Sequence, residues 1–142
     1  HATLQTVDLA TGDGLAGAAR AQALAEGVED RADLVVALAR SGFAASATRE
    51  AAGHPHQKET YVGTVASGQV VEGFIDLLYT DESGGLVVID YKTDAEPSEQ
   101  MIGEYQKQLA VYAAALGDAT GLSVTRRVLV FCREGDAVEV EV

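Results

Sequence analysis

Cysteine, tryptophan and basic residues are scarce in this chain. Its 142 residues include 1 cysteine and no tryptophan, and 22 acidic residues outnumber 10 basic ones, for a net charge of −12. A single cysteine excludes both a disulfide framework and a cysteine-based zinc site. The shortage of lysine and arginine argues against a free-standing nucleic-acid binder, because such proteins usually carry a basic surface.

Long apolar runs and targeting signals are also missing. No stretch of about 18 apolar residues is present, which excludes a transmembrane helix. The first residues lack the basic-then-apolar pattern of a signal peptide. We therefore expect a reduced, cytoplasmic protein with no membrane partner and no disulfide-linked partner. Because the chain starts at His1 within a helical pattern, we interpret it as a fragment of a longer polypeptide.

The composition that remains, 47% apolar and 23% charged, is typical of a globular domain. The apolar period is helical in the first half and strand-like in the middle. Predicted helices span residues 1–9, 15–25, a segment capped by Asp30, 43–52 and 97–116, and predicted strands span 58–65, 69–79, 86–92, 125–132 and 137–142. This order predicts one α/β domain over residues 1–142, with a mixed sheet and a helical N-terminal half.

Two aspartates are expected near each other in the second and third strands. Asp90 and Lys92 lie two residues apart in one strand and so share a face, and Asp76 lies in the neighbouring strand. An aspartate at the end of so apolar a strand needs a partner, which could be Lys92 or a metal ion. Two adjacent carboxylates repel unless a cation lies between them, and oxygen ligands suit Mg²⁺ or Mn²⁺.

A metal-free arrangement is the alternative interpretation of the same residues. In that case Asp76 and Asp90 are strand-end residues that face water with their carboxyls far apart, and Lys92 forms a surface ion pair. Tyr105 and Tyr112, with Gln108 between them, occupy one face of the long predicted helix. That stripe also fits the edge of an amphipathic core.

Taken together, these runs resemble the PD-(D/E)XK nuclease superfamily, in particular the RecB-like nuclease domain of helicase–nucleases. The resemblance rests on Gly73-Phe74-Ile75-Asp76 (first metal-binding Asp), Ile89-Asp90-Tyr91-Lys92-Thr93-Asp94 (central motif) and Tyr105-Gln106-Lys107-Gln108-Leu109-Ala110-Val111-Tyr112 (QxxxY signature). Glu59 is similar to the Glu of the first strand. His1 resembles the metal-binding His of the first helix; its alternative origin is a purification-tag remnant.

The resemblance implies a restriction-endonuclease-like fold and a metal-dependent DNA nuclease. It implies that His1, Asp76, Asp90 and the Tyr91 carbonyl hold Mg²⁺ or Mn²⁺, that Lys92 acts on the attacking water or the developing charge, and that Glu59 contacts metal through water. The remaining residues, Tyr105, Gln108 and Tyr112, would position DNA or support the motif strand.

At the level of the whole protein, the resemblance implies an exonuclease domain of an ATP-dependent helicase–nuclease that acts in DNA repair and recombination. Because the chain is acidic, we expect DNA to be held mainly by attached helicase domains or a partner subunit. The alternative function is a catalytically inactive, nuclease-like module that binds DNA or a partner.

Overall fold

Five strands form one mixed sheet in the order β1-β2-β3-β4-β5. The computed structural model describes residues 1–142. Its elements are α1 (Ala2–Thr6), α2 (Leu15–Ala25), the 3-10 turn η1 (Glu29–Arg31), α3 (Ala32–Ala44), α4 (Ser46–Ala52), β1 (His56–Ala66), β2 (Gln69–Thr80), β3 (Leu86–Lys92), α5 (Glu99–Thr120), β4 (Val124–Phe131) and β5 (Val138–Glu141). Neighbouring strands are antiparallel except β3 and β4, which are parallel and are joined through α5.

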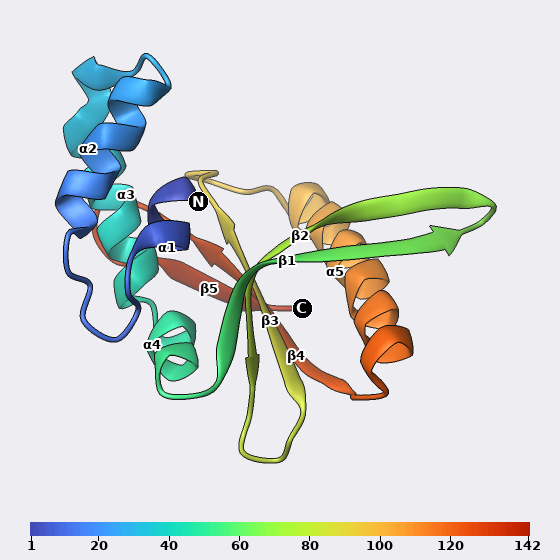
Figure 1. Ribbon diagram of the computed structural model, residues 1–142. Helices are drawn as coiled ribbons and strands as arrows, with labels where there is room; N and C mark the ends of the chain where they lie inside the picture. Colours follow the sequence, from blue (N-terminus) through green and yellow to red (C-terminus); the bar gives the residue numbers. More distant parts are fainter.

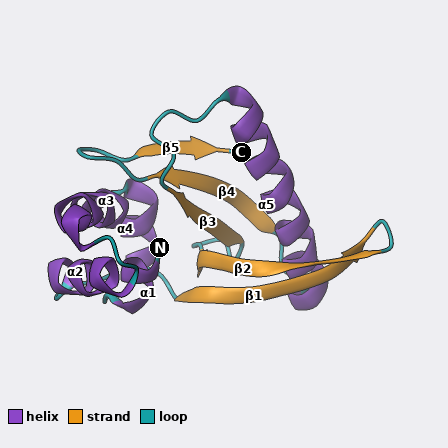
Figure 2. Ribbon diagram, turned by 90° about the horizontal axis from the view of Figure 1, so that it is seen from above, coloured by secondary structure: helices purple, strands orange, loops and turns teal.

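Helices cover both faces of this sheet (Figures 1 and 2). The small helices α1 to α4 pack on one face, and α5 lies across the other. Residues of β3 and β4 alternate between the two resulting cores, as the strand period requires: Val87 and Ile89 face α1 to α4, whereas Leu86 and Val88 face α5. β3 is buried on both faces, which explains its continuous apolar run.

The β1–β2 hairpin is much longer than the other strands and extends past α5 (Figure 1). Near the body of the domain it pairs with β3, whereas its far half has no further strand beside it. Tyr61 and Phe74 are paired across the two strands in this far half, and both are more than half exposed. The hairpin is therefore held at its base by β3, and farther out by α5, against which Val62 is buried.

The structure confirms the predicted α/β fold class with a restriction-endonuclease-like mixed sheet. The predicted bounds of α2 and β3 agree with the structure, and those of the other strands differ from it by one or two residues. None of the helices combines the length and the apolar character that a membrane span requires.

Several predicted helix starts were wrong. Asp30 does not cap a helix, because it lies inside η1, and α3 follows Arg31 without a side-chain cap. The long helix does not begin at Pro97 but after Ser98, whose hydroxyl accepts a hydrogen bond of 3.1 Å from the Met101 N–H. A local side chain that can satisfy a free N–H thus decides where α5 begins.

Predicted helix ends were also displaced. The first helix ends at Thr6 rather than residue 9, because Val7 turns to an extended conformation. The fourth predicted helix was expected from residue 43, but α3 runs to Ala44 and α4 starts at Ser46, after the extended Ala45. The long helix continues through Gly117 and ends at Gly121, whose left-handed φ of 72° suits glycine.

Candidate functional site

The site lies where β2 and β3 separate. Their pairing runs from Thr80 opposite Leu86 to Leu77 opposite Ile89 and stops there. The next two positions in this register are Asp76 and Asp90. Instead of a ladder bond, the Tyr91 N–H donates a hydrogen bond of 2.8 Å to Asp76 Oδ2. The apolar strands therefore hold two carboxylates at the fork between them.

The β1–β2 ladder is interrupted on the other side of Asp76. Lys58 pairs with Leu77 and Thr60 with Ile75, so Glu59 lies opposite Asp76, but these two residues are not paired and Glu59 has a φ of 50°. The register is the same on both sides of the interruption. Glu59 lines one pocket together with His1 and Asp76.

Asp76 is in an environment that opposes its negative charge. Its side chain is 10% exposed. Burial, followed by the charge of Asp90, raises the pKa of Asp76 to about 7, and Glu59 adds to the rise, while the Tyr91 N–H opposes it. The Asp76 and Asp90 carboxyls therefore lie close enough to interact, contrary to the alternative in which they are far apart.

Asp90 and Lys92 form an ion pair on the face of β3 that is directed toward α5. Lys92 Nζ lies 2.8 Å from Asp90 Oδ2. The approach lacks hydrogen-bond geometry, so the buried Oδ2 has a charge partner and no hydrogen-bond donor. Lys92 Nζ also lies 4.2 Å from the centre of the Tyr105 ring, and the Tyr105 hydroxyl donates to Asp94 Oδ2 at 2.9 Å. Tyr105 is thus brought to the fork by α5.

Gln108 and Tyr112 lie along the same helix but make different contacts. Gln108 Nε2 donates to the Tyr112 hydroxyl at 3.3 Å, and Tyr112 is buried in the core between α5 and the sheet. A Cβ on Gly73 would lie 2.0 Å from that hydroxyl, so Tyr112 packs directly against the β2 backbone three residues before Asp76. These contacts are those of residues that support β2.

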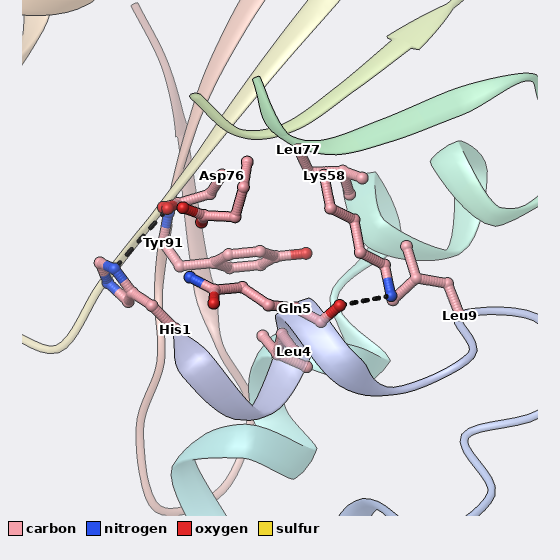
Figure 3. Close-up of a pocket in the computed structure, with 9 residues that line it drawn as sticks. His1, Leu4, Gln5, Leu9, Lys58, Asp76, Leu77 and Tyr91 are labelled. Atoms are coloured by element: carbon pink, nitrogen blue, oxygen red, sulfur yellow. Dashed lines mark hydrogen bonds and ion pairs between the residues drawn. The ribbon is translucent and has the colours of Figure 1, made fainter. Parts of the chain in front are cut away.

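His1 reaches the fork from α1 (Figure 3). Its Nδ1 lies 3.7 Å from Asp76 Oδ1, and the imidazole is 42% exposed. Leu4 and Tyr91 line the pocket beneath it. The site thus combines residues from the start of α1, β1, the β2–β3 fork and α5.

Two supporting residues were missed by the sequence reasoning. Thr48 Oγ1 lies 2.8 Å from the Tyr91 hydroxyl, which ties the motif strand to α4. Lys58 Nζ donates to the carbonyls of Gln5 and Val7, which ties β1 to the end of α1. Partners separated by 43 to 53 residues leave no local signal in the sequence.

Comparison with known proteins places this arrangement in a family. A family model described as the PD-(D/E)XK nuclease superfamily matches residues 1–141. The chain belongs to this superfamily. Its members generally use divalent metal ions, and the predicted recognition from the Asp76, Asp90 and Gln108 motifs is confirmed.

Curated relatives of this superfamily member are much longer than the chain. It is 39% identical over 70 residues to an ATP-dependent helicase/nuclease subunit from Lysinibacillus sphaericus, covering 43% of the chain and 6% of the relative. The same-named protein of Lacticaseibacillus casei is 39% identical over 72 residues, covering 50% and 6%. The same-named protein of Anoxybacillus flavithermus is 46% identical over 52 residues, which cover 33% of the chain and 4% of the relative. The matched stretches thus span about 6% of the first relatives' length.

The side-chain donors of this nuclease-family site are few. No group of three or more His, Cys, Asp or Glu side chains lies close enough together to hold a metal ion unaided. The donor set does fit a divalent cation in two respects: two carboxylates interact unfavourably at the fork, and the buried Asp90 Oδ2 lacks a hydrogen-bond donor.

Proposed function

We propose that the chain is the metal-dependent DNA nuclease domain of a larger ATP-dependent helicase–nuclease, acting as an exonuclease in DNA repair and recombination in the cytoplasm. The observation that carries this proposal is the carboxylate pair at the β2–β3 fork, with Lys92 beside it. Family membership and the names of the relatives support it.

In this proposal Mg²⁺ or Mn²⁺ is held by Asp76, Asp90, the Tyr91 carbonyl and His1, with water completing the shell because the side-chain donors are few. The ion would polarise the scissile phosphate and lower the pKa of bound water. Its binding would also relieve the repulsion between the two carboxylates, which is the unfavourable feature of the metal-free fork.

The chain's own residues would prepare the reaction. Lys92 is the last residue of β3, and its ammonium lies beside Asp90. There it would orient or deprotonate the attacking water, or stabilise the charge on the phosphate. Glu59 would act from β1 through a water molecule. Gln108 and Tyr112 would keep β2, and with it Asp76, in place.

DNA would reach the fork from other parts of the protein. The chain carries a net charge of −12, which favours phosphate binding elsewhere in the polypeptide or on a partner subunit. We infer that residues 1–142 form one nuclease domain whose substrate is delivered by helicase domains.

The direct test is cleavage of single-stranded and duplex DNA by the full-length polypeptide with Mg²⁺. Asp90→Asn removes a carboxylate charge from the fork and Lys92→Gln removes the ammonium, and each should reduce the rate by about a hundredfold or more. Glu82→Gln in the exposed β2–β3 turn is the matched control and should cleave like the wild type. Equal rates for all four proteins would exclude this mechanism.

Calorimetric titration with Mn²⁺ separates the inactive-module alternative. An intact fork should bind Mn²⁺ in the wild type and lose most of that affinity in Asp90→Asn. Absence of Mn²⁺ binding in the wild type, with no cleavage, would favour a domain that only binds DNA or a partner.

A further inference from the structure

The helix that carries His1 has little structure of its own to hold it. α1 has 5 residues, and no side chain caps its N-terminus. An isolated helix this short is unstable, since the first turn orders three residues for one hydrogen bond. Burial of Leu4 in the core and a bond from the Thr6 hydroxyl to the Thr3 carbonyl fix the middle of the helix. Its C-terminal carbonyls need partners from elsewhere.

Lys58 supplies those partners. Its half-buried side chain crosses from β1 to the end of α1, where Nζ donates to the Gln5 carbonyl at 3.4 Å (Figure 3). Nζ also donates to the Val7 carbonyl. A cation at a helix C-terminus is also favoured by the helix dipole. One ammonium group thus satisfies two carbonyls that α1 itself leaves free.

The position of Lys58 connects this contact to the candidate metal site. Lys58 pairs with Leu77, the residue after Asp76, and it precedes the unpaired Glu59. At the opposite end of α1, His1 Nδ1 lies 3.7 Å from Asp76 Oδ1. Both ends of α1 therefore contact the same short segment of the β1–β2 ladder.

We propose that Lys58 is a positioning residue: by holding the C-terminal end of α1 against β1, it keeps His1 beside Asp76. The inference rests on the proposed function, in which His1 and Asp76 share a metal ion. A lysine that only stabilised the fold would contribute to stability independently of His1. A positioning lysine would act on metal affinity through His1 and would lose that effect when His1 is replaced.

A double-mutant cycle on Mn²⁺ affinity tests this difference in the full-length polypeptide. The four proteins are the wild type, Lys58→Met, His1→Ala and the double variant, each titrated by calorimetry. Methionine retains an apolar stem and removes the donors. We expect Lys58→Met to weaken Mn²⁺ binding about tenfold, as loss of a residue that orients a ligand does. The double variant should bind no more weakly than His1→Ala.

Two further variants complete the design. Lys58→Arg keeps a cationic donor and should restore most of the affinity. Lys107→Met, at an exposed position on α5, makes the same change of charge without touching α1 and should bind Mn²⁺ like the wild type. In the metal-free protein, the amides of α1 should exchange with solvent faster in Lys58→Met than in Lys107→Met, because α1 has lost its C-terminal anchor.

The outcomes distinguish the two levels of the proposal. Independent losses in the cycle, or unchanged α1 exchange in Lys58→Met, would overturn the role of Lys58 while Mn²⁺ binding by the wild type still supported the nuclease site. Failure of the wild type to bind Mn²⁺ would overturn the proposed metal site and the role of Lys58 together.

Discussion

Asp76 is the residue at which the fold and the chemistry of the site conflict most directly. The strands bury its carboxyl next to Asp90, and both effects raise its pKa, to about 7. In an unfolded chain an aspartate releases its proton near pH 3.9. Between these two values the folded protein binds more protons than the unfolded one. The free energy of unfolding must therefore fall as the pH rises through that interval.

We predict that the metal-free chain becomes less stable between pH 5 and pH 8, by up to a few kcal/mol, and that Asp76→Asn removes most of this decrease. Urea unfolding in EDTA at both pH values measures it. Asp81→Asn is the control: hydrogen bonds from Ser83 and Thr125 lower the pKa of Asp81 to about 2, so its contribution changes only below this range. Equal pH dependence in the wild type and Asp76→Asn would contradict the prediction.

Gly73 leaves room for the Tyr112 side chain, which a larger residue at this position would displace. We predict that Gly73→Ala destabilises the domain by about 1–3 kcal/mol, because its Cβ would lie 2.0 Å from the Tyr112 hydroxyl. Adding Tyr112→Phe should recover part of this loss. The control is Gly63→Ala in β1, where the nearest atom is the hydroxyl of the exposed Tyr61 side chain, which has room to shift into solvent. Thermal or urea unfolding of the variants measures these differences, and equal stability of both alanine variants would exclude the clash.

At the scale of elements, the sequence predicts strands and helices that have a regular apolar pattern. It does not predict features that depend on contacts with residues far away in the chain. β3 was predicted with its bounds because both of its faces are buried and the apolar run is continuous. The approach of Asp76 to Asp90 was anticipated because they lie in neighbouring antiparallel strands, whereas the end of the pairing just before them was not. The left-handed conformation of Glu59 was not anticipated either, since this residue type does not mark it. The anchoring of α1 by Lys58 was not predicted, because Lys58 and its partners are separated by 51 and 53 positions in the sequence.

The start of α4 shows the same dependence on a distant element. No local side chain caps α4, but the carboxylate of Glu139 in β5 accepts bonds from the Ser46 hydroxyl and, at 2.7 Å, from the Ala47 N–H. We predict that Glu139→Ala lowers the free energy of unfolding by about 1 kcal/mol, the usual value of a helix cap. Urea unfolding measures it.

Glu141 in the same strand is the matched comparison for Glu139. Its carboxylate forms an exposed ion pair with Arg126. Such pairs contribute about 0–1 kcal/mol, so Glu141→Ala should change the stability less than Glu139→Ala does. A larger loss in Glu141→Ala would show that β5 is held by its charges rather than by its contact with α4.

At the scale of the whole molecule, the acidic charge is concentrated in the part of the sequence that contains Asp76 and Asp90. Residues 71–104 contain 9 acidic residues and 1 basic residue. Asp76 and Asp90 account for two of these acids, and a divalent cation at the fork would neutralise their charge. The others lie in β2, in loops and on α5, and none of them forms an ion pair. A domain of this charge has few groups with which to neutralise DNA phosphates.

We therefore predict that the 142-residue chain alone binds a labelled single-stranded oligonucleotide more weakly than about 10⁻⁴ M, the weak limit of typical non-specific binding. Its affinity should hardly change between 50 and 200 mM salt, because few counterions are released when so few phosphates are contacted. Fluorescence anisotropy in EDTA measures both quantities without cleavage. The full-length polypeptide should bind more tightly and with a steep salt dependence, since its phosphate contacts would lie outside residues 1–142. Tight, salt-sensitive binding by the isolated chain would show instead that this acidic domain recruits DNA itself.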